Sequence, residues 1–259
     1  MGSGLTLTTA GSILVAASLA STSSADTIAV PADQPTISDA LAVAADGDAI
    51  NIAAGIYTDT DLMPSVANLR IVGETDASGN LLVTIHALGG GMIFGFGLIG
   101  SEGATLENLV LTGCARIAVW IHHHLPTIRK CVFEANTAAE GFGGAAIWAM
   151  STQTVVEHCR FTDTAAEHGR GVIQSGGSTA TGIVIRDSVF CGNAAGTIDI
   201  ESIWTNEGGN VFDDECLDVC IGDLNEDGIV NGADLALILG AWGNADRCRP
   251  DRSKDAVES

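Results

Sequence analysis

The chain has 259 residues, with 11 basic residues against 32 acidic ones and a formal net charge of −21 at pH 7. This balance argues against a nucleic-acid partner, because a phosphate backbone has to be met by Lys and Arg. Apolar residues make up 46% of the sequence, and the length suffices for one solenoid with a small appendage rather than for two large domains.

Residues 1–25 have the composition of a secretory signal peptide. The apolar run from Ile13 to Ala20 is too short to span a bilayer, and small residues follow it, as they do before a cleavage site. No Lys or Arg precedes that run. We predict cleavage after Ala25, with Ala20 as the second choice and a disordered Ser/Thr-rich leader as the alternative. The mature protein is then secreted or held at the cell surface, without a membrane span.

One helix and three strands are predicted at the start of the mature chain. A strand at residues 27–31 is followed by a helix at residues 35–45, opened by Pro35, and by strands at residues 49–52 and 55–57. An amphipathic helix can cover the open end of a solenoid. The apolar face of this helix consists of Ile37, Ala40, Leu41 and Ala44.

A pattern of apolar-x-x-small-x-large apolar residues begins at Ile128 and occurs four times. The other copies begin at Leu106, Val156 and Ile185, so the intervals are 22, 28 and 29 residues. A short repeated unit of this kind indicates a solenoid in which each copy is one rung. Each repeat carries a second apolar run, and two short runs with a period of two residues favour strands over helices. The pattern predicts an all-β fold, a parallel β-helix.

The N-terminal run VPADQPTISDALAVAADGDAINIAAGIY resembles the opening segment of secreted right-handed β-helix proteins of the pectin-lyase-like superfamily. Together with the four repeats, the resemblance covers residues 26–212. It implies a right-handed parallel β-helix that binds or processes extracellular polysaccharide. The open alternatives are a polysaccharide lyase or glycoside hydrolase and a non-catalytic structural or adhesion protein. The coils carry no Asp-Asp pair of the kind that glycoside hydrolysis would use.

Stacked rungs place equivalent residues about 4.8 Å apart, so each position of the repeat forms a column. We expect Phe133, Phe161 and Phe190 to stack in one buried column, and Cys131 and Cys159 to share another inward column as free thiols. The sequence has seven cysteines in all, so at least one is left unpaired within the chain. Cys114 and Cys191 lie just beyond strand ends. Cys216, Cys220 and Cys248 bracket the C-terminal segment, which a Cys220–Cys248 bridge would close.

Two polar columns follow the first apolar column. The nearer one alternates in sign, which predicts an outward ladder of ion pairs, and consists of Glu107, Arg129, Glu157 and Arg186. The next one consists of Asn108, Lys130, His158 and Asp187. A base beside an acid allows a catalytic interpretation, although a solvated surface explains the same residues. The catalytic candidates are Glu157, His158, Lys130 and Asp187.

The second strands place aromatic residues on neighbouring rungs. By parity we expect an outward column of Trp120, Trp148, Ile173 and Asp199, with His122, Met150, Ser175 and Glu201 two residues further on. Two indole rings on adjacent rungs would form a flat surface for the apolar face of a sugar, with His122 and Glu157 nearby. Alternatively, a loop covers the rings or reversed parity buries them. The acidic protein would repel uronic acid polymers, so a neutral glycan fits better.

After an acidic linker at residues 213–221, residues 222–243 contain a loop of the EF-hand type. Oxygen ligands for Ca²⁺ fall at loop positions 1, 3, 5, 9 and 12, with a backbone carbonyl at position 7 and Gly228 for the tight turn. The predicted ligands are Asp223, Asn225, Asp227, Asn231, Asp234 and the carbonyl of Ile229.

The final Asp of this loop and the helix expected at Leu235–Trp242 resemble one half-repeat of a type I dockerin. This resemblance implies attachment to a cohesin-like or cell-surface partner. The loop positions that meet cohesin in that family are Gly232 and Ala233 here, which lack hydroxyl groups. Residues 244–259 are predicted to form a disordered tail without a second half-repeat.

Overall fold

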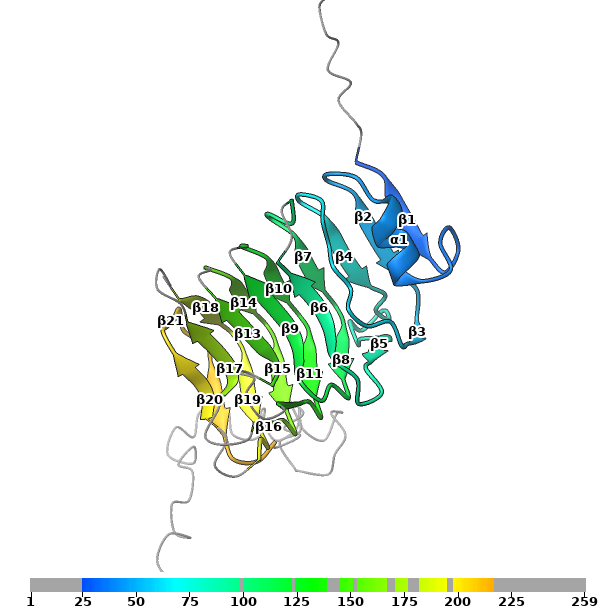
Figure 1. Cartoon of the computed structure of the whole chain (residues 1–259). Helices are drawn as coiled ribbons and strands as arrows, with labels where there is room; N and C mark the ends of the chain where they lie inside the picture. Colours follow the sequence, from blue (N-terminus) through cyan, green and yellow to red (C-terminus); the bar gives the residue numbers. More distant parts are fainter. Residues whose placement is uncertain are drawn as a thin grey trace, which may run out of the picture.

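The computed structural model describes residues 25–97, 100–122, 124–138, 145–150, 153–166, 171–176, 182–194 and 198–216. This part of the chain forms an all-β parallel solenoid of about six turns, which confirms the predicted fold class (Figure 1). Three main parallel sheets run along it. No helix of the described residues is long and apolar enough to cross a membrane.

The sheets, named A, B and C, each take about one strand from every turn. Sheet A consists of β1 (Thr27–Val30), β2 (Ala49–Ile52), β4 (Arg70–Gly73), β7 (Thr105–Glu107), β10 (Thr127–Arg129), β14 (Val155–Glu157), β18 (Ile183–Arg186) and β21 (Trp204–Asn206). Sheet B consists of β3 (Gly55–Tyr57), β5 (Val83–His86), β8 (Val110–Thr112), β11 (Val132–Glu134), β15 (Arg160–Thr162), β19 (Val189–Cys191) and β22 (Val211–Asp213).

Sheet C consists of β6 (Met92–Phe96), β9 (Ile117–His122), β13 (Ile147–Met150), β17 (Gly171–Gly176) and β20 (Ile198–Ser202). A separate pair joins β12 (Thr137–Ala138) to β16 (Ala165–Ala166). The four repeats pair in the predicted register in sheet A, where Ile128 lies between Leu106 and Val156. This register stacks every repeat position into a column along the solenoid.

The helix α1 (Ile37–Val43) covers the N-terminal end of the solenoid, where it packs against β1 and β2 (Figure 1). It is shorter than the predicted helix because Thr36, rather than Pro35, caps it. The Thr36 hydroxyl accepts a hydrogen bond from the Asp39 N–H at 3.0 Å, and the chain turns to an extended conformation at Ala44. Ile37 and Ala40 are fully buried against the first coil.

A ladder of phenylalanine rings fills the core beside sheet B. The ring centroids of Phe133 and Phe161 are 4.8 Å apart, and those of Phe161 and Phe190 are 4.5 Å apart. All three side chains are fully buried, which confirms the predicted column. Phe212 adds a fourth ring at 5.0 Å from Phe190. Aromatic stacking therefore repeats the same contact from coil to coil.

In the four repeats, a left-handed residue forms the bend between the strand of sheet A and the next strand of sheet B. Asn108, Lys130, His158 and Asp187 all have φ between 49° and 59°. The column beside the ion-pair ladder is therefore a column of bend residues. The residues that follow these bends point inward. Two of them are Cys131 and Cys159, which are buried free thiols, as expected.

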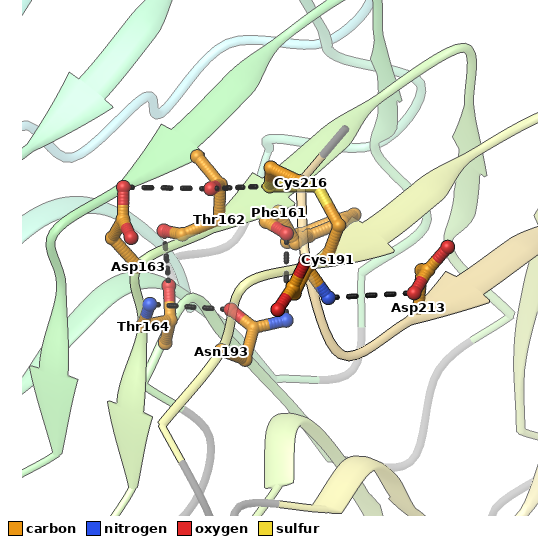
Figure 2. Close-up of a disulfide and its surroundings, with 9 residues drawn as sticks. Phe161, Thr162, Asp163, Thr164, Cys191, Asn193, Asp213 and Cys216 are labelled. Carbon is orange, nitrogen blue, oxygen red and sulfur yellow. Dashed lines mark hydrogen bonds between the residues drawn. A yellow bond between two sulfur atoms is a disulfide. The ribbon is translucent and has the colours of Figure 1, made fainter. Parts of the chain in front are cut away.

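Asparagine side chains inside the solenoid satisfy the backbone at the bends that follow sheet B. Asn136 is fully buried; its amide donates to the Leu111 carbonyl at 2.9 Å and accepts from the Cys114 N–H at 3.1 Å. Asn193 makes the same two contacts two coils further on, with the Phe161 carbonyl and the Thr164 N–H (Figure 2). Buried peptide groups that the sheets leave unpaired thus find partners.

A disulfide between Cys191 and Cys216 fastens the chain that leaves β22 back onto β19 (Figure 2). The Cys216 sulfur also lies 2.9 Å from the Thr162 hydroxyl on β15. Cys216 therefore belongs to the last coils rather than to the segment beyond them. Cys220 and Cys248 lie outside the described residues.

Candidate functional site

Trp120 and Trp148 lie side by side on the outer face of sheet C. They are paired in the register of β9 and β13. Their strand neighbours Val119, Ile121 and Ile147 are fully buried, so the alternation of the strands turns both indole rings outward. Both tryptophans are half-buried, as predicted for a platform on adjacent rungs.

A pocket of about 320 Å³ opens over this platform. Its described lining residues are Asp61, Met92, Arg116, Ile117, Trp120, His122, Trp148 and Met150. The lining is mainly apolar and aromatic, with three ionisable groups. This combination is typical of sites that bind organic ligands.

Two glycines make room for the side chains at this end of the platform. A Cβ atom on Gly97 would lie 2.3 Å from the Trp120 ring, so this ring takes its position only because no side chain stands there. Gly95 pairs with Trp120, and a Cβ atom on it would collide with the side chains of Met63 and Met92. On its other side, Trp120 stacks on His122, with ring centroids 5.6 Å apart. These contacts fix the position of the Trp120 ring by packing.

Asp61 is carried by a short segment that pairs with the edge of sheet C. Its N–H donates to the Met92 carbonyl at 2.8 Å, and the Leu62 N–H donates to the Ile93 carbonyl at 2.9 Å. Asp61 has a left-handed backbone with φ 53°. These bonds hold its carboxylate at the end of the pocket nearest β6, where it can accept hydrogen bonds from a ligand.

Arg116 brings a positive charge to the same pocket from the turn before β9. Asp61 and Arg116 also act in opposite directions on the buried thiol of Cys114, whose pKa is raised chiefly by its burial. The two charges thus lie close enough to one thiol to influence it together. Sequence reasoning missed Asp61, Met92 and Arg116, because all three lie outside the repeated pattern.

The predicted outward column is wrong beyond the second rung. Trp148 pairs with Gln174, and Gln174 pairs with Glu201, so Ile173 and Asp199 do not continue the tryptophan column. Ile173 is fully buried, and so is Val172 beside it. Two adjacent buried apolar residues hide the alternation of the strand, which shifted the prediction by one residue. Met150 follows His122 as predicted, but the next position is Gly176 instead of Ser175.

The catalytic candidates lie elsewhere, on sheet A and at its bends. The Glu157 carboxylate accepts from Arg186 Nε at 2.8 Å, and this contact and charge raise the pKa of Arg186. Lys130 Nζ lies 3.8 Å from Glu107, and His158 Nε2 lies 4.0 Å from Asp187. None of the four is among the described lining of the tryptophan pocket. Glu157 lies on β14 of sheet A, whereas both tryptophans lie on sheet C.

The charged column on sheet A forms ion pairs at the two ends of the predicted ladder, Glu107 with Arg129 and Glu157 with Arg186. Arg129 reaches Glu107 at 2.6 Å, and Arg186 reaches Glu207 at 3.0 Å on its other side. Glu107 also lies 3.6 Å from Arg70 and is almost fully buried beneath these cations. Within the described residues these contacts account for the charges without a substrate.

The predicted calcium ligands lie outside the described residues. They are Asp223, Asn225, Asp227, Ile229, Asn231 and Asp234. In the described part of the chain, no group of three or more His, Cys, Asp and Glu residues could hold a metal ion.

Comparison with known proteins finds solved structures of low similarity. No family model matches the sequence, and no curated protein matches it. Among solved structures, a pectin methylesterase in complex with a hexasaccharide aligns with a TM-score of 0.42 and 13% identity, over 74% of this chain and 66% of that one. Pectin methylesterase from carrot aligns with a TM-score of 0.35 and 12% identity, over 72% of this chain and 82% of that one. The chain thus spans just under two thirds of the first of these proteins.

Proposed function

We propose that this protein is a secreted or cell-surface β-helix that binds extracellular polysaccharide on the Trp120–Trp148 platform. The observation that carries the proposal is the pairing of two half-buried indole rings on adjacent rungs, at the floor of an open pocket. The apolar face of a sugar ring packs on an indole, and successive sugars could lie along successive rungs.

The charged groups of the pocket fit the hydroxyl groups of a sugar. The Asp61 carboxylate accepts hydrogen bonds and the Arg116 guanidinium donates them, so together they can hold neighbouring hydroxyls. The net charge of −21 disfavours polymers of uronic acids. A neutral glycan is therefore the ligand that we propose.

Binding without turnover is favoured over catalysis. Glycoside hydrolysis normally uses two carboxyl groups that flank the scissile bond. Asp61 is the only carboxylate among the described residues that line the pocket. A polysaccharide lyase or glycoside hydrolase remains the second candidate, with Asp61, Arg116 and His122 as the groups that would act.

Secretion, a right-handed winding of the coils and calcium binding at residues 223–234 belong to the same proposal. The Cys191–Cys216 disulfide supports secretion, because disulfides persist mainly in oxidising compartments. The spacing of the oxygen ligands supports the calcium loop. This loop would serve an attachment segment whose partner is a cohesin-like or other cell-surface protein.

A glycan array with the full chain tests the proposal. We expect binding to neutral polysaccharides, weakened about tenfold or more in Trp120→Ala and in Trp148→Ala because each removes one stacked ring. Trp204→Ala is the matched control, since Trp204 lies on β21, away from the pocket. Circular dichroism confirms that each variant is folded.

A reducing-sugar assay and an unsaturated-product assay separate binding from catalysis. Product release that Asp61→Asn abolishes would establish the enzyme alternative, whereas Glu157→Gln should leave any activity unchanged. If wild type binds no glycan, or if Trp148→Ala binds as well as wild type, the platform has no such role.

A further inference from the structure

The C-terminal end of the solenoid exposes an apolar surface. The last strands of sheets A, B and C are β21, β22 and β20, which lie at the opposite end from α1 (Figure 1). Ile203, Val211 and Phe212 are 55%, 50% and 44% exposed. Trp204 meets Phe212 edge to face at 6.1 Å, so the two rings form the outermost layer of the core.

Within the described residues, a helix covers the N-terminal end of the solenoid, whereas the last strands of the C-terminal end are uncovered. At the N-terminal end, α1 buries Ile37 and Ala40 completely on the first coil. At the other end, β21 and β22 pair on one side only. A solenoid requires caps at its ends, and an uncovered strand edge invites pairing with other chains. We therefore expect another segment to cover the exposed apolar layer at β21 and β22.

The sequence beyond Cys216 supplies a segment with the right pattern. Leu235, Ile238, Leu239 and Trp242 follow the spacing i, i+3, i+4 and i+7, which places them on one face of a helix. Leu237 falls on the opposite face of the same helix. The segment thus has one apolar stripe of the width that a cap needs.

The tether between this segment and the solenoid begins at the exposed end. The disulfide holds Cys216 on β19, which pairs with β22 (Figure 2). The residues from Cys216 to Leu235 can span up to about 60 Å when extended, at about 3.3 Å per residue. Reach therefore does not limit the docking of the segment, and the short tether raises its local concentration.

We propose that residues 235–242 form an amphipathic helix that caps the C-terminal end of the solenoid, with its stripe on Ile203, Trp204 and Phe212. The stripe removes the exposed apolar layer from water, as α1 does at the other end. The calcium loop of the proposed function directly precedes this helix, so calcium binding orders the helix and strengthens the cap. The first partner of the C-terminal segment is then the protein's own last coil.

Hydrogen exchange measured by mass spectrometry on the full chain tests this cap. With calcium present, we expect peptides of β21 and β22 to exchange about tenfold slower in wild type than in Ile238→Asp, because the charge ejects the stripe from the end. Leu237→Asp is the matched control and should exchange like wild type. On the solenoid side, Ile203→Asp should also lose the protection in β22.

Ile56→Asp controls for this second change, because Ile56 is another exposed isoleucine, on β3 and 76% exposed. Equal effects of Ile238→Asp and Leu237→Asp, or no effect of either, would overturn the cap. Protection that rises with protein concentration, together with a dimer in sedimentation, would overturn it in favour of a second copy.

Calorimetry with calcium on the same protein keeps the two proposals apart. Calcium binding without protection of β21 and β22 refutes the cap and leaves the calcium loop standing. Protection that depends on Ile238 without any calcium heat supports the cap and removes calcium from the proposed function. Neither result changes the expectation for glycan binding at Trp120 and Trp148.

Discussion

Replacing Phe161 by Ala should destabilise the solenoid strongly, because this ring is the centre of the phenylalanine ladder. It is fully buried and stacks on a ring above and a ring below, at 4.8 and 4.5 Å. A buried Phe→Ala change costs about 3–5 kcal/mol, and the two ring pairs place this site in the upper part of that range. We expect a loss of about 4–5 kcal/mol.

Phe212→Ala is the matched control for position in the ladder. Phe212 is 44% exposed and stacks on one ring of the ladder, that of Phe190. Compared with Phe161, this residue has about half of the buried area and one stacked ring of the ladder instead of two. The expected loss of stability is therefore about 2 kcal/mol.

Urea unfolding followed by far-ultraviolet circular dichroism measures both losses on the same protein. The ratio between the variants matters more than either value, since it removes shared errors of extrapolation. Equal losses for the two variants, or a loss below about 1 kcal/mol for Phe161→Ala, would show that the ladder does not carry the stability that its geometry implies.

Three further predictions concern polar groups of the coils. Asn136→Ala should cost about 1–3 kcal/mol in urea unfolding, because it leaves the buried Cys114 N–H without its acceptor and removes one donor to the Leu111 carbonyl. The N–H groups of Ala45 and Asp26 hold the pKa of the Asp48 carboxyl below its usual value. Its contribution to stability is therefore present above about pH 4 and is lost as the pH falls. The melting temperature should drop more steeply below about pH 4 in wild type than in Asp48→Asn. Burial raises the pKa of the Cys159 thiol, so iodoacetamide at pH 8 should label it only after unfolding, and labelling of the folded protein would contradict its place in the core.

The sequence predicted the register correctly where a large apolar side chain recurs at one position of the repeat. A Phe occupies the same place in three of the four repeats, where only the interior suits it. Phe133, Phe161 and Phe190 therefore indicated the register of sheets A and B. In sheet C, Val172 and Ile173 are adjacent and both buried, so the apolar pattern left two registers open. Only packing distinguishes them.

The bends and the pocket show other reasons for missed features. Asn108 and Asp187 are residue types that tolerate a left-handed backbone, whereas Lys130 and His158 give no such signal. Asp61 reaches the tryptophan pocket through one isolated bridge, between Leu62 and Phe94, which no periodic pattern marks. Cys216 lies in an acidic stretch that looked like a linker, although its disulfide joins it to the coils.

The charge ladder on sheet A restricts how the number of coils can change by gene duplication. Internal duplication of a single coil is the simplest way for a solenoid gene to grow. Along this ladder, however, acid and base alternate from Glu107 to Arg186, so one extra coil would set two like charges on facing strands. Duplication of two coils, such as residues 106–155, keeps every acid beside a base. The ladder therefore favours the gain and loss of coils in pairs. This constraint comes from the charged side chains and not from the packing of the apolar core.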